Sequence, residues 1–475
     1  MYTYQDLVAL GENESERQIF IKSVIENHKN SSLYKTAITA EEYDKCKNVT
    51  IRQFQKLLYT VSGKAVPDNY SANWKMTTGF FHRDVLQEVQ HLLGNGVTWA
   101  DEATANKLGK DFDIRLQEIG KYALIGGVAF GFFNLDHLDV FSVKEFAPLY
   151  DEENGALSAG VRFWQVTDDK PLRATLYEID GYTDYMWKKE VVHVLHEKRP
   201  YILNTRTSEI DGTEIYDGEN YPTFPIVPLW GNPLHQSELV GLREQIDCYD
   251  LIKSGFANDV DDASQIYWTI QNAGGMDDVD LAKFVERIKT VKAAAVMEDG
   301  AKAESHSMEV PYASREALLD RLMKDLYKDA MALDTENIVS GATTATQIRA
   351  AYEPLDSKCD EFEYCIHDFL DGVLSVAGIE NETPTFTRST VMNVQEEIQT
   401  VISAATYLED EYITRKILTL LGDGDKADEM LKKMDADELK RLSSDFGSNG
   451  MGNNTSNDSE GKEDTEESQE ETQEE

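Results

Sequence analysis

The chain has 475 residues, of which 41% are hydrophobic, and this is enough for two or three domains with at least one sizeable core. Its 46 basic and 87 acidic residues give a formal net charge of −41, so the chain as a whole repels phosphate. Because gripping a nucleic-acid backbone requires clustered Lys and Arg, this balance excludes a conventional nucleic-acid binder. The same balance does not exclude a protein that forms a channel through which DNA moves without binding.

The N-terminus, MYTYQDLVALGENESE, has no basic segment followed by an apolar core, so we expect no signal peptide and a soluble, intracellular chain. The longest apolar run, residues 123–133, has about half the length of a membrane span and predicts a strand hairpin or a helix-to-strand junction. The cysteines form no close-spaced framework, so we expect reduced, buried thiols. They are Cys46, Cys248, Cys359 and Cys365.

Up to about residue 94 the pattern is helical. Residues 16–28 should place Ile19, Phe20, Ile21, Val24 and Ile25 on roughly one face, and residues 80–93 form a second amphipathic segment that stops at Gly94. From residue 120 to about 228, short β-branched and aromatic segments alternate with turn formers. This texture predicts an antiparallel sheet, because no helix-length stretches intervene.

Two long helices are predicted next, over residues 237–260 and 314–333, each with apolar residues at gaps of three and four. The stretch between them, residues 264–311, should form a small α/β insert with strands in QIYWTI and VKAAAVM and a short helix in DLAKFVERIK. A third long helix is expected over residues 344–377, where Pro354 should bend it. The fold class is therefore mixed α+β and predominantly helical.

Two further amphipathic helices are predicted over residues 396–421 and 425–442. Beyond about residue 446 the sequence is Gly, Ser, Asn, Glu and Asp, with no apolar residue after Met451. Such a segment cannot offset its ordering entropy, so we expect an acidic, disordered tail over residues 446–475.

Signals for an enzyme, a metal or a cofactor are weak. The chain has no GxxxxGK[ST] phosphate loop, and the glycines around Gly126 do not form GxGxxG. Asp423 begins a segment like a calcium loop, but Ala427 and Asp428 stand where an oxygen ligand and a glycine are needed. The pairs His193/His196 and Cys359/Cys365 have the wrong spacing for zinc. We therefore expect no enzyme activity, no metal and no cofactor.

Residues 225–263, PIVPLWGNPLHQSELVGLREQIDCYDLIKSGFANDVDDA, resemble the portal family of long-tailed phages of Gram-positive bacteria. That family has a Pro-rich strand, an Asn-containing turn, a Ser-acidic-Leu helix start, an Ile-Asp-x-Tyr-Asp core, a Ser and an Asn-Asp pair. The chain departs at Glu238, where Asp is usual, and at Cys248, where a small residue is usual. Looser similarity in the same order extends over roughly residues 15–445, including 73–99, 143–164 and 407–434.

The resemblance implies a ring, usually a dodecamer, built from named parts. They are a wing over residues 1–233, a first stem helix over 234–262, a clip over 263–313, a second stem helix over 314–333, a tunnel loop over 334–346, a long kinked helix over 347–389 and a crown over 390–445. Pro354 would be the helix kink. The tunnel loop candidates are Asn337, Ser340, Gly341, Thr343, Thr344 and Thr346.

Acidic residues on the first stem helix would then line the channel. The candidates are Glu238, Glu244, Asp247, Asp250, Asp259, Asp261 and Asp262. Repeated around a ring, they would disfavour close phosphate contact and let DNA slide. For any one of these residues, a simple solvated helix face is an equally good interpretation.

By this resemblance the chain is the portal vertex subunit for DNA packaging and ejection, made in the bacterial cytoplasm and located at a unique capsid vertex of the virion. Its expected partners are copies of itself, double-stranded DNA, the terminase large subunit, a head-completion or adaptor protein, and major capsid and scaffolding proteins, with no membrane. Two alternatives stay open: a capsid adaptor or scaffold-type protein without a DNA channel, and an acid-rich hydrolase.

Overall fold

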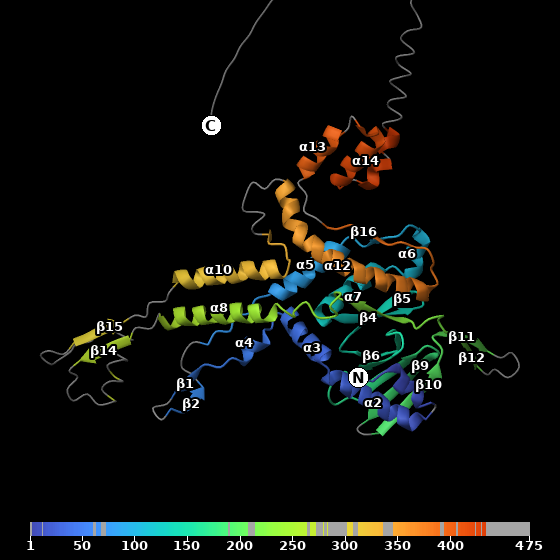
Figure 1. Ribbon diagram of the computed structural model, residues 1–475, viewed down its shortest axis with the longest axis horizontal. Helices are drawn as coiled ribbons and strands as arrows, with labels where there is room; N and C mark the ends of the chain where they lie inside the picture. The colour runs from blue at the N-terminus through green and yellow to red at the C-terminus, as the bar shows by residue number, and fades with distance from the viewer. Residues whose placement is uncertain are drawn as a thin grey trace, which may run out of the picture. The chain divides into compact units, whose positions relative to one another are not determined.

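The computed structural model describes residues 2–11, 13–59, 63–67, 73–188, 191–207, 214–263, 267–271, 279, 283, 302–306, 312–335, 345–389, 394–404, 407–422, 424–428 and 430–433. The chain divides into two compact units, Met1–Thr390 and Val391–Glu475 (Figure 1). None of the described helices is both long enough and apolar enough to cross a membrane.

Helices dominate the beginning of the first unit, as predicted. They are α1 (Tyr4–Ala9), α2 (Glu14–Asn30), α3 (Ser32–Asp44), α4 (Val49–Gln53) and α5 (Phe80–Leu93). Side chains of Asn13, Ser31 and Asn48 cap α2, α3 and α4 by accepting a backbone N–H. One detail of the prediction for α2 is wrong: Ile19 is 69% exposed. Successive residues turn by about 100°, so Ile19 cannot share a face with Ile21.

The predicted antiparallel sheet is confirmed as a five-stranded meander in the order β10-β9-β8-β7-β6. Its strands are β6 (Phe146–Tyr150), β7 (Leu157–Trp164), β8 (Leu172–Glu178), β9 (Gly181–Lys188) and β10 (Val191–Arg199). A second antiparallel sheet has the order β13-β4-β5. It consists of β4 (Val128–Asn134), β5 (His137–Ser142) and β13 (Ile226–Trp230). The strands β4 and β13 pair although the five-stranded meander lies between them in sequence.

The remaining described elements of this region are short or paired in twos. They are β1 (Leu57–Tyr59) with β2 (Ala65–Pro67), β3 (Val97–Thr98) with β16 (Thr385–Phe386), β11 (Ile202–Thr207) with β12 (Glu214–Glu219), and α6 (Glu102–Leu108).

The apolar run at residues 123–133 is a helix-to-strand junction, one of its two predicted forms. Helix α7 (Phe112–Gly126) ends at Gly127, and β4 starts at the next residue. Gly127 has φ +85°, and a Cβ there would come within 3.0 Å of the Gln236 carbonyl carbon. The junction thus needs glycine for its backbone angle and for the close approach of the chain after β13.

Two hydrophobic cores organise this unit. Helix α2 packs on the five-stranded sheet, where Phe20, Ile21 and Tyr185 are buried in one cluster. The larger core joins α3, α5, α7 and the second sheet to three later helices. These are α8 (Arg243–Ala263), α10 (Tyr312–Asp329) and α12 (Ala345–Ala377).

The two predicted long helices and the third helix are confirmed, with different ends. Ser237 was predicted to start the first, but α8 starts at Arg243, since the Ser237 hydroxyl accepts the Leu239 N–H in a local turn and Gly241 has φ +96°. Helix α10 ends at Asp329, four residues before the predicted Leu333, and Met331 has φ +54° just beyond it. Pro354 lies inside α12. Figure 1 shows this helix bending between its first turns and the rest of its length.

Of the predicted insert between α8 and α10, the described part is one antiparallel pair, β14 (Tyr267–Gln271) with β15 (Lys302–His306). The strand in QIYWTI is thereby confirmed. The predicted segments DLAKFVERIK and VKAAAVM lie outside the described residues, apart from Lys283.

In the second unit, the single helix predicted over residues 396–421 is wrong. Two helices stand there, α13 (Val394–Ala404) and α14 (Asp410–Leu420). Asp410 and Glu411 in the first turn of α14 favour a new helix N-terminus at that point. A 3-10 turn, η2 (Gly424–Lys426), follows. Most of the helix predicted over 425–442 and the whole predicted tail lie outside the described residues.

All four cysteines are free thiols, but only part of the prediction about them holds. Cys359 is buried and Cys365 is half-buried, whereas Cys46 and Cys248 are exposed. Cys248 is exposed because it lies on the side of α8 opposite the buried Asp250 and Ile246.

Candidate functional site

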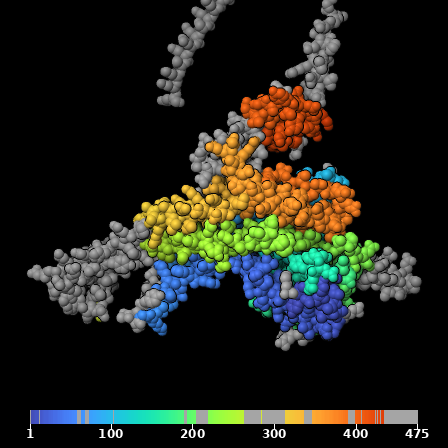
Figure 2. Space-filling view, in the orientation of Figure 1, coloured from blue at the N-terminus to red at the C-terminus, as the bar shows by residue number. Residues whose placement is uncertain are grey.

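Helix α8 lies between the N-terminal helices on one side and α10 and α12 on the other. In the space-filling view it is part of the green band that runs between the blue and the yellow-to-orange atoms (Figure 2). On one side it packs against α10, where Gln245 Nε2 donates to Asp329 Oδ2 at 2.6 Å and Arg315 pairs with Asp259. The Phe256 and Tyr312 rings meet edge to face, with centroids 5.9 Å apart. The predicted helix pair thus exists as a packed unit.

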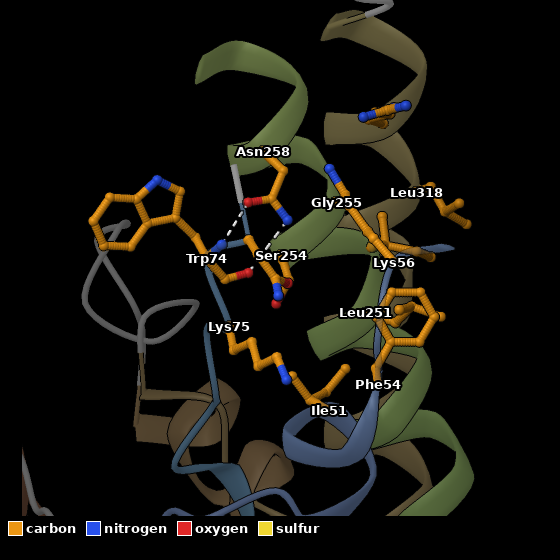
Figure 3. A pocket seen from close by; sticks show the side chains of 13 residues that line it. Ile51, Phe54, Lys56, Trp74, Lys75, Leu251, Ser254, Gly255, Asn258 and Leu318 are labelled. Carbon is orange, nitrogen blue, oxygen red and sulfur yellow. Dashed lines mark hydrogen bonds between the residues drawn. The ribbon is translucent and has the colours of Figure 1, made fainter. Parts of the chain in front are cut away.

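The other side of α8 carries a ladder of polar side chains that holds residues 73–78, here called the strap. Asn258 Oδ1 accepts the Trp74 N–H at 2.6 Å, and its Nδ2 donates to the Trp74 carbonyl at 3.3 Å (Figure 3). The Ser254 hydroxyl accepts the Met76 N–H at 2.9 Å and donates to the Met76 carbonyl at 3.3 Å. These bonds replace the partners that an extended backbone otherwise finds in a sheet.

Asp250 forms the third rung, because its Oδ1 accepts the Thr78 N–H at 2.8 Å. The rungs are four residues apart on α8 and two apart on the strap. Four helical residues rise about 6.0 Å, and two extended residues rise about 6.6 Å. The two repeats therefore stay in step over three rungs, which explains why these residues recur at a spacing of four.

Asp250 and Asp247 also fix the N-terminal helices to α8. Asn48 Nδ2 donates to Asp250 Oδ2 at 2.8 Å. The hydroxyls of Tyr43 and Thr50 both donate to the Asp247 carboxylate, Thr50 at 2.8 Å. Burial raises the pKa of Asp250 to about 6, although the hydrogen bonds from Asn48 and Thr78 oppose that rise. Asp250 is fully buried.

The predicted acidic wall is therefore not a single surface. Asp250 cannot face a channel, and the prediction is wrong for this residue because it binds the strap. Asp247 and Asp259 are held largely by partners within the chain. Glu244 and Asp261 are exposed. For Asp262, the backbone belongs to α8 and the side chain is outside the described set.

Glu238, another predicted channel residue, instead joins a buried ionic cluster. Its carboxylate accepts from Asn232 Nδ2 at 2.7 Å and lies 3.4 Å from Lys358 Nζ. Lys358, on α12, also lies 2.8 Å from Glu88 Oε2 and 3.3 Å from Asp84 Oδ1, both on α5. One ammonium thus faces three carboxyl groups, and we call these four residues the α5–α12 cluster. Asp84 and Glu88 are almost fully buried.

Electrostatics in this cluster are set first by burial. Desolvation raises the pKa of Glu88 to about 8, against the opposing effect of the Lys358 charge. Desolvation likewise raises the pKa of Asp84. Burial disfavours the charged form of Lys358, but the carboxylates of Glu88, Asp84 and Glu238 outweigh it and raise the pKa of this lysine. Near neutral pH the cluster therefore holds a proton on a carboxyl group.

Helix α5 fastens the chain on both sides of the predicted tunnel loop. Gln87 Nε2 donates to the Leu333 carbonyl at 3.1 Å, and Gln87 Oε1 accepts the Leu333 N–H at 2.9 Å. After the loop, the rings of His91 and Tyr352 stack with centroids 5.4 Å apart. His91 Nε2 also lies 2.8 Å from Asp356 Oδ1.

The predicted tunnel-loop residues Asn337, Ser340, Gly341, Thr343 and Thr344 lie outside the described residues. Thr346 is described: it is exposed in the first turn of α12.

Sequence reasoning missed the α5–α12 cluster. Asp84 and Glu88 are spaced i, i+4 on α5, interleaved with the buried Phe81, Val85 and Val89. Lys358 directly precedes the buried Cys359. Charged residues within an apolar stripe on two different helices were the available signal. Within the part of the chain that the structure describes, no group of three or more His, Cys, Asp or Glu is arranged to hold a metal ion.

Comparison with known proteins identifies the family of the chain. Residues 21–441 match the family model described as phage portal protein, SPP1 Gp6-like. The portal protein of Bacillus phage SPP1 is 24% identical over 419 residues, which cover 81% of this chain and 80% of that protein. The portal protein of Clostridium phage phiCD119 is 25% identical over 291 residues, or 58% of this chain and 62% of that protein, a little under two thirds of its length.

Among solved structures, the chain is similar to one from the neck of a native GTA particle computed with C12 symmetry. The identity is 11% and the TM-score 0.40, covering 71% of this chain and 89% of that one. The family match spans both cores, α8, α10, α12 and the helices of the second unit. This chain belongs to the phage portal protein family of the SPP1 Gp6-like type.

Proposed function

We propose that this portal protein assembles into a closed ring at one vertex of a phage capsid, and that duplex DNA passes through the ring during packaging and ejection. The observation that supports this most is the match to the portal family over residues 21–441, which includes the paired helices α8 and α10. The portal family is structural, and we propose no enzyme activity for this chain.

The acidic-wall hypothesis is kept in a narrower form. Glu244 and Asp261 are exposed on α8, although the Asp261 carboxylate also accepts the Trp74 indole N–H at 3.3 Å, and they remain the candidates for a repelling channel surface together with Asp262. Repeated around a ring, even two or three carboxylates per subunit form a dense acidic band. Such a band keeps phosphates at a distance and favours sliding over binding.

The tunnel loop remains a proposal for residues 334–346. Gln87 holds the backbone of Leu333 immediately before it, and α12 begins at Ala345, so the last two residues of the predicted loop, Ala345 and Thr346, are helical. Both flanks are thus attached to helices of the larger core. Ser340, Gly341 and Thr344 have small side chains suited to a segment that lies close to DNA.

The proposed partners follow from membership of a portal family. They are other copies of the chain, double-stranded DNA, the terminase large subunit, a head-completion or adaptor protein, and the major capsid and scaffolding proteins. ATP hydrolysis would belong to the terminase. The protein would be made in the host cytoplasm and end in the virion, with the ring at a single vertex.

Negative-stain electron microscopy of the purified full-length chain tests the proposal. The expected image is a ring of about twelve subunits, the number that the resemblance to the portal family implies, with a central hole wide enough for duplex DNA. Head-to-tail contacts that close symmetrically produce such a ring. A chain that stays a compact monomer at all protein concentrations would contradict it.

A further inference from the structure

A groove of about 480 Å³ opens beside the ladder, between α4, the strap, α8 and α10. In Figure 3 the side chains of Ile51, Phe54, Leu251 and Leu318 gather along it, whereas the Trp74 ring points away. The groove belongs entirely to described residues.

Much of the apolar surface of this groove is exposed to solvent in the isolated chain. Phe54 is 47% exposed, Leu251 42% and Leu318 45%. Single exposed apolar residues need no explanation, but several lining one concavity mark an interaction site. Covering them would remove apolar surface from water on both partners.

The rim of the groove has the opposite charge to the chain. Lys56, Lys75 and Arg315 line it, and no Asp or Glu does, although Arg315 pairs with Asp259 beyond the lining and Lys75 Nζ donates to the Arg52 carbonyl at 2.7 Å. The whole chain has 87 acidic residues against 46 basic ones, so a lining with three cations and no anion is a local reversal. The occupant that fits such a groove presents an apolar group flanked by carboxylates.

The hairpin β1–β2 stands next to this rim, because Lys56 immediately precedes β1. These two strands pair with each other and with no other described strand. A two-stranded hairpin alone is at most marginally stable in water. It would therefore gain from a surface that lies against it.

We propose that the groove is where the next copy of this chain docks in the portal ring. This inference rests on the proposed function, since it names the contact by which the ring closes. A second copy carries the same formal net charge of −41, and a cationic face such as this one offsets part of the repulsion between copies. DNA fits less well, because a phosphate backbone offers nothing to the apolar floor.

The contact is of the head-to-tail kind, in which the groove of one copy receives a different surface of its neighbour. Such contacts close into rings when the rotation per subunit divides a full turn. In a closed ring, the groove of every copy is then occupied by one neighbour, and the acidic surface of the same copy occupies the groove of the other neighbour.

The test uses the purified full-length chain in sedimentation velocity and native mass spectrometry. Leu251→Asp and Leu318→Asp place a carboxylate in the groove at half-exposed positions, and Lys75→Glu reverses the charge of its exposed rim. The control is Ile114→Asp. Ile114 lies on α7, is 66% exposed and does not line the groove. Thermal unfolding of each monomer checks that the variants fold.

The wild-type chain and Ile114→Asp should form rings at the same concentration. The groove variants should need at least about tenfold more protein, which corresponds to a loss of about 1.4 kcal/mol per contact. If Leu251→Asp or Leu318→Asp unfolds early, Lys75→Glu decides the matter alone.

Rings formed by all the variants at the wild-type concentration overturn this inference and leave the proposed function standing. A wild-type chain that never forms rings overturns the proposed function, and this inference with it. Groove variants that form normal rings but lose binding to a labelled DNA duplex would assign the groove to nucleic acid and also overturn it.

Discussion

The ladder on α8 and the α5–α12 cluster both place carboxylates inside the fold, but they stabilise it by different means. In the ladder, Asp250, Ser254 and Asn258 bind a backbone, and each partner is a neutral N–H or carbonyl group. In the cluster, one lysine is surrounded by three carboxyl groups. The ladder therefore depends on register, and the cluster on the balance of charge.

This difference shows what each site tolerates. A rung of the ladder can lose a hydrogen bond at modest cost, because the strap is close to water. In the cluster, losing the single cation leaves buried anions without a partner, which costs far more than a neutral hydrogen bond. Substitutions at the two sites should therefore differ in the size of their effect on stability and in its dependence on pH.

The largest effect is expected for Lys358→Met, which keeps the volume of the side chain and removes its charge. Asp84 and Glu88 are almost fully buried and would lose the ammonium group of Lys358, the single cation of the cluster. The free energy of unfolding should fall by about 3–5 kcal/mol. Urea unfolding at pH 7, followed by tryptophan fluorescence, measures this change.

Lys324→Met serves as the control, because Lys324 is exposed on α10 and the substitution is chemically the same. Its effect should stay within about 0.5 kcal/mol, as for most surface changes. A loss below about 1 kcal/mol in Lys358→Met would show that the cluster is weakly coupled to folding.

The second prediction concerns pH and the cluster. Burial raises the pKa of Glu88 to about 8 in the folded chain, from its ordinary value of 4.5, so between these two pH values the folded state keeps a proton that the unfolded state has lost. The free energy of unfolding should therefore decrease as the pH rises through this window, by about 1 kcal/mol per pH unit. Glu88→Gln cannot titrate and should remove that slope.

The interval from pH 7 to pH 8 separates the two sites. Burial also raises the pKa of Asp250, but only to about 6. Asp250 is therefore almost fully ionised by pH 7, and it adds almost nothing to the pH dependence of the free energy of unfolding between pH 7 and 8. A slope between pH 7 and 8 in the wild type that disappears in Glu88→Gln therefore belongs to the cluster. Parallel curves for the two proteins, measured by urea unfolding at each pH, would refute the assignment.

Much of the fold could be predicted from the sequence, because its signals are local. The meander of β6–β10 has strands separated by turn formers, and α12 has an apolar stripe from Leu355 to Val373, so periodicity identifies both. Helix ends were less predictable. The start of α8 depends on a turn at Ser237 and on the positive φ of Gly241, and no periodic pattern encodes these.

The polar sites could be predicted only in part, for a physical reason. Asp250, Ser254 and Asn258 stood out only as parts of the motif that resembles the portal family, and that motif cannot tell a solvated face from one that binds a strap 170 residues or more away in sequence. The cluster brings together residues from α5, α12 and the turn before α8. Such a meeting depends on tertiary packing, which a single helix does not reveal.

The smallest effect is expected in the ladder, for Ser254→Ala. The Ser254 hydroxyl makes two bonds to the Met76 backbone, and both are lost. Alanine favours a helix more than serine does, so part of the loss is offset. Ser357→Ala is the matched control, since Ser357 lies exposed within α12 and its hydroxyl donates only to the Glu353 carbonyl one turn back.

The difference between the two serine variants isolates the ladder, because both gain the same helix propensity. Ser254→Ala should be less stable than Ser357→Ala by about 1 kcal/mol, the net value of a neutral hydrogen bond whose partners water can reach. The loss should also be independent of pH above 7, since neither partner titrates. Hydrogen exchange at the Met76 amide should quicken in Ser254→Ala and stay unchanged in the control. If the amide exchanges equally in both, the strap is held by packing, and the register of the ladder has no energetic role.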